Sequence, residues 1–260
     1  MAAITRWVRF EHQGQAAFGT LDGTTVAAHE GDMFGTARPT GQTLALSGLK
    51  LLAPVRPGKV LALWNNYMAL ASKLGLADPA EPLYFMKAPS SLLGPGDAIV
   101  APKGKGKIVF EGELAVVIGR RAKAVSEAGA LDHVFGYTCC NDVTAAEVLN
   151  RDASFAQWVR AKSYDTFCPL GPCIATGLDP ATLSVKTWLE GQLRQDYPLA
   201  DIRFSVPRLV SLISHDMTLE PGDLILCGTS VGVGSLKPGQ AVEVEIEGIG
   251  KLTNRFETAD

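Results

Sequence analysis

The sequence lacks the features that would place it in several common classes of protein. It has no block of basic residues, since 24 Lys and Arg stand against 27 Asp and Glu for a formal net charge of −3, and it therefore lacks the electrostatic footprint of a nucleic-acid binder. No apolar run reaches membrane-spanning length, and charged residues interrupt the apolar ones over residues 1–14, so no signal-peptide core is present. We therefore expect a cytoplasmic protein that acts on a small molecule, with neither nucleic acid nor membrane as a partner.

Paired cysteine spacing is also absent. The five cysteines are odd in number and form no CxxC pair, which argues against both a disulfide framework and a zinc site. We expect reduced, mostly buried thiols. The 260 residues, 47% of them hydrophobic, are enough to bury a substantial core in one large domain with a small companion.

Frequent turn signals divide the chain into short segments. Residues 4–30 alternate apolar and polar side chains around Asp22-Gly23, a strong hairpin signal, and predict a small N-terminal β domain over residues 1–52. Residues 53–260 contain the turns "GPGD", "EPGD" and "KPGQ", and their few helical segments are near 66–76, 126–135, 144–150 and 206–214. This pattern predicts a mainly β fold with some helix (α+β), built as a mixed-sheet barrel or roll.

Two glutamates interrupt the apolar run "IVFEGELAVVIG" at residues 108–119. Because successive side chains of a strand alternate between its faces, Glu111 and Glu113 are predicted to lie side by side. One interpretation is a solvated sheet face, since carboxylates are seldom buried without partners. The other is a hard metal ion held by oxygen ligands, with Gly112 keeping the facing backbone open. The second interpretation needs a third ligand.

Asp142 in "GYTCCNDVTAAE" follows a strand and precedes a helical stretch, a position from which a short carboxylate can face a cleft. On its own it would be interpreted as a helix cap. Together with Glu111 and Glu113, it would supply three carboxylates from two elements. Such a set suits octahedral Mg²⁺ or Mn²⁺, with Ca²⁺ as an alternative and zinc less suited.

Several motifs together resemble the fumarylacetoacetate hydrolase family, in its branch of isomerases, decarboxylases and acylpyruvate hydrolases that act on 2-oxo acids. They are "LYFMKAPSSLLGPGDAIVAP", "FEGELAVVIGRRAKAVSEAGALDHVFGYTCCNDVT", "QWVRAKSYDTFCPLGP", "FSVPRLVSLISHDMTLEPGDLILCGTSVGVG" and "LKPGQAVEVEIEGIGKLTNRF". The resemblance implies a β-roll catalytic domain, a homodimer, and a divalent metal held at Glu111, Glu113 and Asp142.

The resemblance also implies roles for three further residues. Lys162 in "RAKSYDTF" matches a family lysine near the metal, where its charge would offset the carboxylates and stabilise an oxyanion. Lys87 in "FMKAPSS" would help to line the entrance and bind substrate. Thr229 in "CGTSVGVG" lies in a glycine-rich turn that would hold the substrate carboxylate. Without the motifs, a surface lysine and an ordinary loop would be the simpler interpretations.

One family pattern is missing from the segment expected to form a lid helix. Hydrolytic members carry a His and a Glu in a pattern like "NYxxHxxE" to activate water, whereas this chain has Leu70 and Lys73 there, or Met68 in a shifted register. Losing such a base should slow hydrolysis by about 10²- to 10⁴-fold. The resemblance, together with this departure from the family pattern, therefore implies a metal-dependent decarboxylase or isomerase of a 2-oxo or 2-hydroxydienoate diacid in aromatic-compound catabolism. An acylpyruvate or fumarylacetoacetate-type hydrolase, and a catalytically degenerate paralogue that only binds metal and 2-oxo acids, remain as alternatives.

Overall fold

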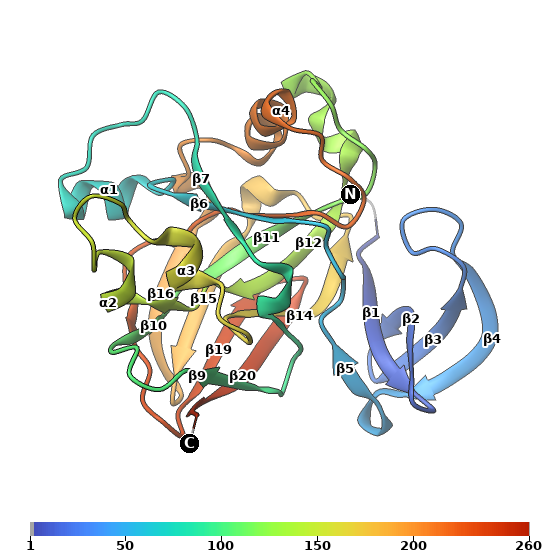
Figure 1. Ribbon diagram of the computed structural model, residues 1–260. Coiled ribbons are helices and arrows are strands. Elements are labelled where there is room, and N and C mark those ends of the chain that lie inside the picture. Colours follow the sequence, from blue (N-terminus) through green and yellow to red (C-terminus); the bar gives the residue numbers. More distant parts are fainter. Residues whose placement is uncertain (1–2, 260) are drawn as a thin grey trace.

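Strands dominate the computed structural model, which describes residues 3–259 (Figure 1). The predicted mainly β class is confirmed. The described residues form three sheets, of which the largest has twelve strands. Its first five strands form the N-terminal part of the molecule: β1 (Thr5–His12), β2 (Gln15–Asp22), β3 (Thr25–Glu30), β4 (Arg38–Ala45) and β5 (Lys50–Leu52). The predicted hairpin is among them, because Asp22 pairs with Thr25 across the turn.

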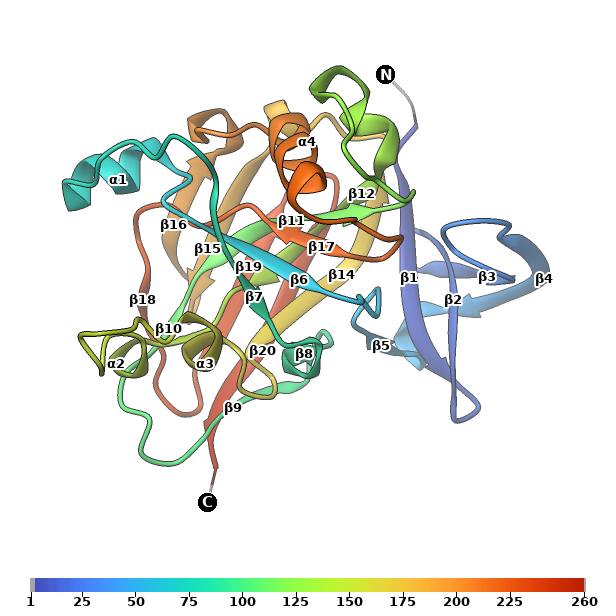
Figure 2. The same cartoon turned by 45° about the horizontal axis from the view of Figure 1, so that its top comes forward.

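The same sheet continues into the rest of the chain. Its other strands are β6 (Val60–Trp64), β7 (Leu83–Lys87), β8 (Leu92–Leu93), β11 (Gly112–Ile118), β12 (Val134–Asn141), β14 (Cys168–Thr176) and β17 (Leu224–Leu226). Strand β1 pairs with β14 in antiparallel register, so the sheet crosses the domain boundary that we predict after residue 52. Figure 2 shows β1 lying along the side of the roll with β2, β3 and β4 outside it.

A five-stranded sheet packs against the large one. It consists of β9 (Ala98–Ala101), β15 (Ser184–Leu189), β16 (Gln192–Pro198), β19 (Ala241–Ile246) and β20 (Gly250–Thr258). The core between the two sheets contains Leu114 and Val116 of β11 with Val185 and Val244 of the facing sheet. Ala115 and Val117, which alternate with these residues, belong to a second cluster on the opposite face. Both faces of β11 are therefore buried, which explains its nearly continuous apolar sequence.

Few helices complete the fold. They are α1 (Met68–Leu74), α2 (Ala146–Leu149), α3 (Trp158–Lys162) and α4 (Val206–Asp216). The longest, α4, begins after Ser205, whose side chain accepts a hydrogen bond from Arg208 N, and α1 ends at Gly75 with φ of 65°. The segment expected to be helical near 126–135 forms a 3₁₀ helix, Glu127–His133, and α3 was not predicted. No helix within residues 3–259 is long and apolar enough to cross a membrane.

Candidate metal centre

Three carboxylates converge where β11 and β12 meet the short sheet of β10 (Ile108–Phe110), β13 (Thr144–Ala145) and β18 (Gly234–Ser235). One oxygen atom from each of Glu111, Glu113 and Asp142 lies within 4.8 Å of the others. Glu113 pairs with Cys140 across the β11–β12 ladder, and Asp142 N donates to Glu111 O at 2.8 Å. Backbone pairing between two segments thus brings together side chains that are far apart in the sequence.

The strand predicted over residues 108–119 is in fact broken at Glu111. Residues 108–110 pair with β13 and β18, whereas β11 begins at Gly112 in the large sheet. Glu111 N donates instead to Asn141 Oδ1 at 3.0 Å. The prediction of one continuous strand was wrong because this switch between sheets depends on pairing with distant segments. The two glutamates still meet, since one oxygen of each lies within 4.8 Å of one of the other.

Gly112 allows close packing behind the carboxylates. A Cβ atom at this position would lie 1.9 Å from Thr187 Oγ1, so any other residue would collide with β15. Gly112 N donates to Gln195 Oε1 at 3.0 Å, and the hydroxyl of Tyr197 donates to Gly112 O. Gln195 and Tyr197 of β16 therefore fix the backbone between the two glutamates. Sequence reasoning missed both, because they lie in no quoted motif and some 80 residues away.

Glu113 is fully buried, and only one of its two carboxylate oxygens accepts a hydrogen bond within residues 3–259. Its Oε2 accepts from Gly228 N at 2.8 Å, while Oε1 has no hydrogen-bond donor among the described residues. Burial, followed by the nearby charges of Asp142 and Glu111, raises the pKa of Glu113 well above its ordinary value. A buried carboxylate oxygen without a partner is unfavourable. A hard divalent cation bound by the three carboxylates would satisfy it, so this donor set fits Mg²⁺ or Mn²⁺.

Lys162 lies against the other two carboxylates. Its Nζ atom donates to Glu111 Oε2 at 2.8 Å and to Asp142 Oδ2 at 2.6 Å. Burial alone would lower the pKa of Lys162, but Asp142, Glu111 and Glu113 raise it above its ordinary value, so the ammonium form persists. Glu111 also accepts from the hydroxyl of Thr144 at 3.0 Å. Burial raises the pKa of Glu111, and Lys162 partly opposes this rise.

Lys87 occupies a different place from the predicted entrance. Its side chain is fully buried, and Nζ donates to Asp142 Oδ1 at 2.6 Å, to Phe167 O at 3.0 Å and to Lys162 O. All three N–H groups of the ammonium are therefore used within the protein. The expectation that Lys87 lines an entrance is wrong, because β7 directs this side chain behind Asp142. Burial would raise the pKa of Asp142, but Lys162 and Lys87 outweigh burial and lower it.

Thr229 is close to the carboxylate cluster, but its hydroxyl group already makes two hydrogen bonds within the protein. It follows Gly228, which holds Glu113, and its hydroxyl donates to Gly112 O at 3.0 Å while accepting from Gln195 Nε2 at 2.9 Å. A hydroxyl group has a single proton to donate. Donation from this hydroxyl to a substrate carboxylate would therefore require the bond to Gly112 to break, whereas contact through the backbone N–H groups of the turn would not.

An aromatic group borders the lysine. The ring of Phe85 stacks on Trp158 with centroids 5.1 Å apart, Trp158 approaches Trp64 at 5.2 Å, and Lys162 Nζ lies 5.4 Å from the Phe85 centroid. All three rings are half-buried. They come from β6, β7 and α3 and form a partly open apolar wall beside the charged cluster.

The helix expected to act as a lid carries no acid–base pair. Leu70 of α1 is half-buried and packs against the larger core cluster, while Lys73 is exposed. The four histidines lie on β1, β3, the 3₁₀ helix Glu127–His133 and α4, and none makes a hydrogen bond to the three carboxylates or to Lys162. The five cysteines are free and buried, as predicted.

Comparison with known proteins connects this geometry to a family. A sequence model described as "Fumarylacetoacetate (FAA) hydrolase C-terminal" matches residues 59–257, and one described as "Rv2993c-like, N-terminal" matches residues 5–54. The crystal structure of 2-hydroxyhepta-2,4-diene-1,7-dioate isomerase from Mycobacterium marinum is 39% identical with a TM-score of 0.90, covering 98% of both chains.

Two other relatives carry informative names. The 4-hydroxyphenylacetate degradation bifunctional isomerase/decarboxylase of Escherichia coli is 42% identical over 202 residues, which are 76% of this chain and 47% of that protein. A structure of maleylpyruvate hydrolase from Sphingobium sp. SYK-6, in complex with manganese(II) ion and pyruvate, is 28% identical. It has a TM-score of 0.80 and covers 98% of this chain and all of its own.

Proposed function

The chain belongs to the fumarylacetoacetate hydrolase family, and we propose that it is a divalent-metal-dependent decarboxylase or isomerase of a 2-oxo or 2-hydroxydienoate diacid in aromatic-compound catabolism. The observation that carries this proposal is the cluster of three carboxylates with Lys162 against it and an unpartnered Glu113 oxygen. The names of the Mycobacterium marinum and Escherichia coli relatives support the same reaction classes.

The charges of the cluster suit an ion and an anionic substrate together. When all three carboxyl groups are ionised, as metal binding requires, they face the two ammonium groups of Lys87 and Lys162, and the buried cluster has one negative charge in excess. Bound Mg²⁺ or Mn²⁺ would reverse this excess and supply Lewis-acid polarisation of a 2-oxo carbonyl. The manganese ion and pyruvate named for the maleylpyruvate hydrolase structure support such a pairing.

We assign to Lys162 the stabilisation of the negative charge that develops in the reaction. In decarboxylation, the bond to the departing carboxylate breaks, its electron pair moves into the 2-oxo group to give an enolate, and a proton is then delivered to carbon. In isomerisation, a proton is removed from one carbon and returned to another. The persistent ammonium of Lys162 offsets negative charge on the enolate oxygen in both reactions. Because the N–H groups of Lys87 are used internally, we assign proton delivery to water.

The aromatic wall favours a conjugated substrate chain. Phe85, Trp158 and Trp64 offer flat, partly exposed apolar surfaces beside Lys162. Planar unsaturated groups pack well against such rings. A dienoate chain extending from the 2-oxo acid end would therefore be held flat, which keeps its π-system aligned with the enolate.

Hydrolysis of an acylpyruvate is the second candidate, favoured by the likeness to maleylpyruvate hydrolase. It requires an activated water, and Leu70 and Lys73 stand where the family pattern has its His and Glu. We therefore place it behind decarboxylation and isomerisation. A degenerate paralogue that binds metal and 2-oxo acids without turnover is the third candidate.

An ultraviolet assay of the purified protein separates the three. Oxaloacetate, an acylpyruvate and a dienol diacid are each followed with Mg²⁺ or Mn²⁺, with a chelator-treated sample as the control. Loss of oxaloacetate or conversion of the dienol, abolished by the chelator, is the expected result. Faster cleavage of the acylpyruvate would favour the hydrolase, and absence of turnover with every compound would favour the degenerate paralogue.

We also propose that the active form is a homodimer. Several large apolar side chains are exposed on and beside β7, α1 and α3, namely Met68, Leu83, Met86, Phe155 and Val159. Phe155 is 69% exposed, and such groups are commonly covered in an assembly. A second copy of the chain is the partner we expect.

A further inference from the structure

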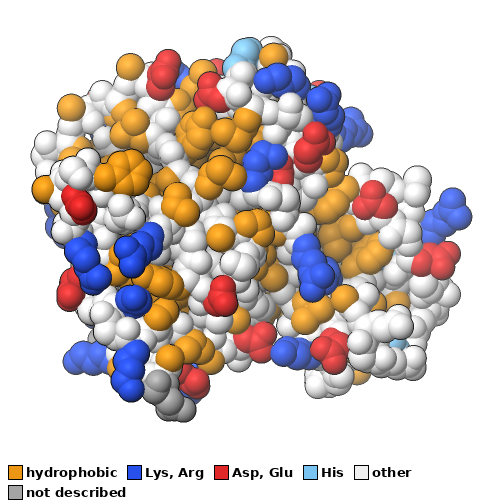
Figure 3. Space-filling model, viewed as in Figure 1, with side chains coloured by type: hydrophobic (Ala, Val, Ile, Leu, Met, Phe, Trp, Pro, Cys, Tyr) orange, Lys and Arg blue, Asp and Glu red, His pale blue; other side chains and the backbone are white. Residues whose placement is uncertain are grey.

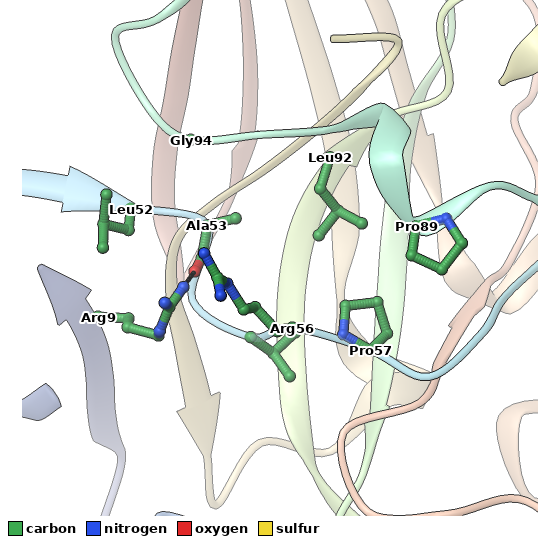
Figure 4. Close-up of a pocket in the computed structure, with 9 residues that line it drawn as sticks. Arg9, Leu52, Ala53, Arg56, Pro57, Pro89, Leu92 and Gly94 are labelled. Carbon is green, nitrogen blue, oxygen red and sulfur yellow. Dashed lines mark hydrogen bonds between the residues drawn. The ribbon is translucent and has the colours of Figure 1, made fainter. Parts of the chain in front are cut away.

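A cavity lies between the N-terminal strands and the roll, apart from the carboxylate cluster. Its volume is about 510 Å³, and it is lined by two groups of residues. One is Arg9 of β1, Leu52 of β5 and the following Ala53, Val55, Arg56 and Pro57, and the other is Pro89, Leu92 and Gly94 of the roll. Figure 4 shows the guanidinium groups of Arg9 and Arg56 next to each other at one side of this cavity. In Figure 3, basic and hydrophobic side chains lie along the junction between the two parts of the molecule.

The two arginines have no acidic partner. Within residues 3–259, no carboxylate oxygen lies within 4.0 Å of either guanidinium group. None of the described residues that line the cavity is Asp or Glu. Burial, followed by the charge of Arg56, lowers the pKa of Arg9, as expected for two cations held together without compensation. Adjacent like charges are unfavourable unless an anion lies between them.

The local backbone holds both groups in position. Arg9 lies in the middle of β1, paired with Phe18 on one side and Leu52 on the other, and its Nη1 atom donates to Ala53 O at 3.1 Å. Arg56 is exposed, but the residues on either side of it, Val55 and Pro57, are buried. The Arg9 fork is therefore already ordered and the backbone at Arg56 is fixed, which reduces the ordering that ligand binding requires.

Among the described residues that line this cavity or the hollow adjoining it, one acidic residue is found, and it lies in the hollow. That hollow shares Arg9, Val55 and Arg56 with the cavity and is also lined by Asp32. The Oδ1 atom of Asp32 accepts from Phe34 N at 3.0 Å, so this carboxylate orders its own loop. Within the part of the chain that the structure describes, the hollow on one side of the arginine pair thus contains one carboxylate, and the cavity on the other side contains none.

We propose that Arg9 and Arg56 form a binding site for a small dianion, a phosphate group or a dicarboxylate, in the cavity between the N-terminal strands and the roll. Guanidinium forks bind both kinds of group through paired, charge-assisted hydrogen bonds. The cavity lies within the usual size range of small-ligand sites. The ligand would join β1 and the loop of residues 53–57 to Pro89 and Leu92, two and five residues beyond Lys87.

Isothermal titration calorimetry of the purified full-length chain tests this site with inorganic phosphate and with succinate, against chloride at equal ionic strength. We expect saturable binding of at least one dianion and none of chloride. Arg56→Gln removes one fork and should weaken binding about tenfold or more. Arg38→Gln, an exposed arginine of β4, is the matched control and should change the affinity less than about twofold.

Three further results decide the interpretation. Glu113→Gln should retain dianion binding, and its loss there would assign the signal to the carboxylate cluster and overturn the proposal. Equal affinity of wild type and Arg56→Gln for the dianion would also overturn it. This comparison does not depend on a variant of Arg9, a residue in the middle of β1 whose replacement can disturb folding. If Arg56→Gln instead dissociates an oligomer in light scattering and neither dianion binds, the pair belongs to a subunit contact and the proposal is wrong.

Discussion

Replacing Glu113 by glutamine should separate the stability of the protein from its affinity for metal. The substitution keeps the shape of the side chain, and an amide oxygen can still accept from Gly228 N, the bond that Glu113 Oε2 makes at 2.8 Å. It removes one of three carboxylates that face two ammonium groups, which leaves two charges of each sign. Without metal, we therefore expect the unfolding free energy of Glu113→Gln to lie within about 1 kcal/mol of wild type or above it.

The effect of metal should be large in wild type and small in the variant. A ligand at about one hundred times its dissociation constant stabilises a protein by about 2.7 kcal/mol. For a chain of this size, each kcal/mol raises the melting temperature by about 2–4 °C, so wild type should gain about 5–11 °C with Mn²⁺. Glu113→Gln should gain less than about 2 °C at the same concentration, since the two remaining carboxylates are already bonded to Lys162.

Differential scanning calorimetry with and without Mn²⁺ measures both quantities, and titration calorimetry gives the affinity directly. Glu257→Gln is the matched control, because Glu257 is exposed on β20. Glu113→Ala should also lose the metal-dependent gain but with a metal-free loss of about 1–3 kcal/mol, since Gly228 N is left without an acceptor. An equal gain in wild type and Glu113→Gln would refute the assignment of Glu113 as a ligand.

Four further predictions concern other parts of the chain. Lys162→Met should lower the metal-free unfolding free energy in urea by about 3–5 kcal/mol, because Glu111 and Asp142 lose their shared cation; a loss below about 1 kcal/mol would contradict the ion-pair geometry. Leu70→His with Lys73→Glu should raise kcat/KM for acylpyruvate hydrolysis at least about tenfold and leave decarboxylation little changed; an efficient wild-type hydrolase unaffected by the change would show that water is activated elsewhere. Burial raises the pKa of Cys173 from 9.0 to about 12. The stability that its neutral thiol contributes is therefore fully present below about pH 9, and the unfolding free energy falls as the pH rises toward about 12, by up to about 1.4 kcal/mol per pH unit. Urea titrations under reducing conditions should show that the unfolding free energy of Cys173→Ser falls less steeply over this pH range. Light scattering should give twice the 27.6 kDa of one chain, and a particle of that single mass at micromolar concentration would contradict the homodimer.

Local sequence signals were sufficient for the features that depend on neighbouring residues. Asp22-Gly23 forms the predicted hairpin turn, Gly75 ends α1, and the apolar stretch from residue 206 forms α4. Turn chemistry and helix periodicity act over a few residues, so they can be read from a single sequence. The convergence of three carboxylates was predicted with the help of the family motifs, and the structure brings the same three together.

Features that depend on long-range pairing could not be predicted in this way. The break at Glu111 follows from the different sheets that β10 and β11 join, and Gln195 reaches Gly112 only after the facing sheet has packed. The burial of Lys87 has the same origin, because its acceptor Phe167 O lies 80 residues along the chain. No property of "FMKAPSS" alone distinguishes a lysine at an entrance from one behind the site.

The pairing of β1 with β14 gives the N-terminal strands a protective role. Thr5, Arg6 and Trp7 pair with Thr176, Ala175 and Ile174, so deleting the N-terminal strands would leave this end of β14 as an open edge rich in apolar residues. Open edges of this kind join other chains strand to strand and promote aggregation. A shortened chain that retains every residue of the carboxylate cluster is therefore expected to self-associate through the uncovered edge. By this reasoning, the N-terminal strands keep one end of β14 from pairing with another chain for as long as the protein is folded.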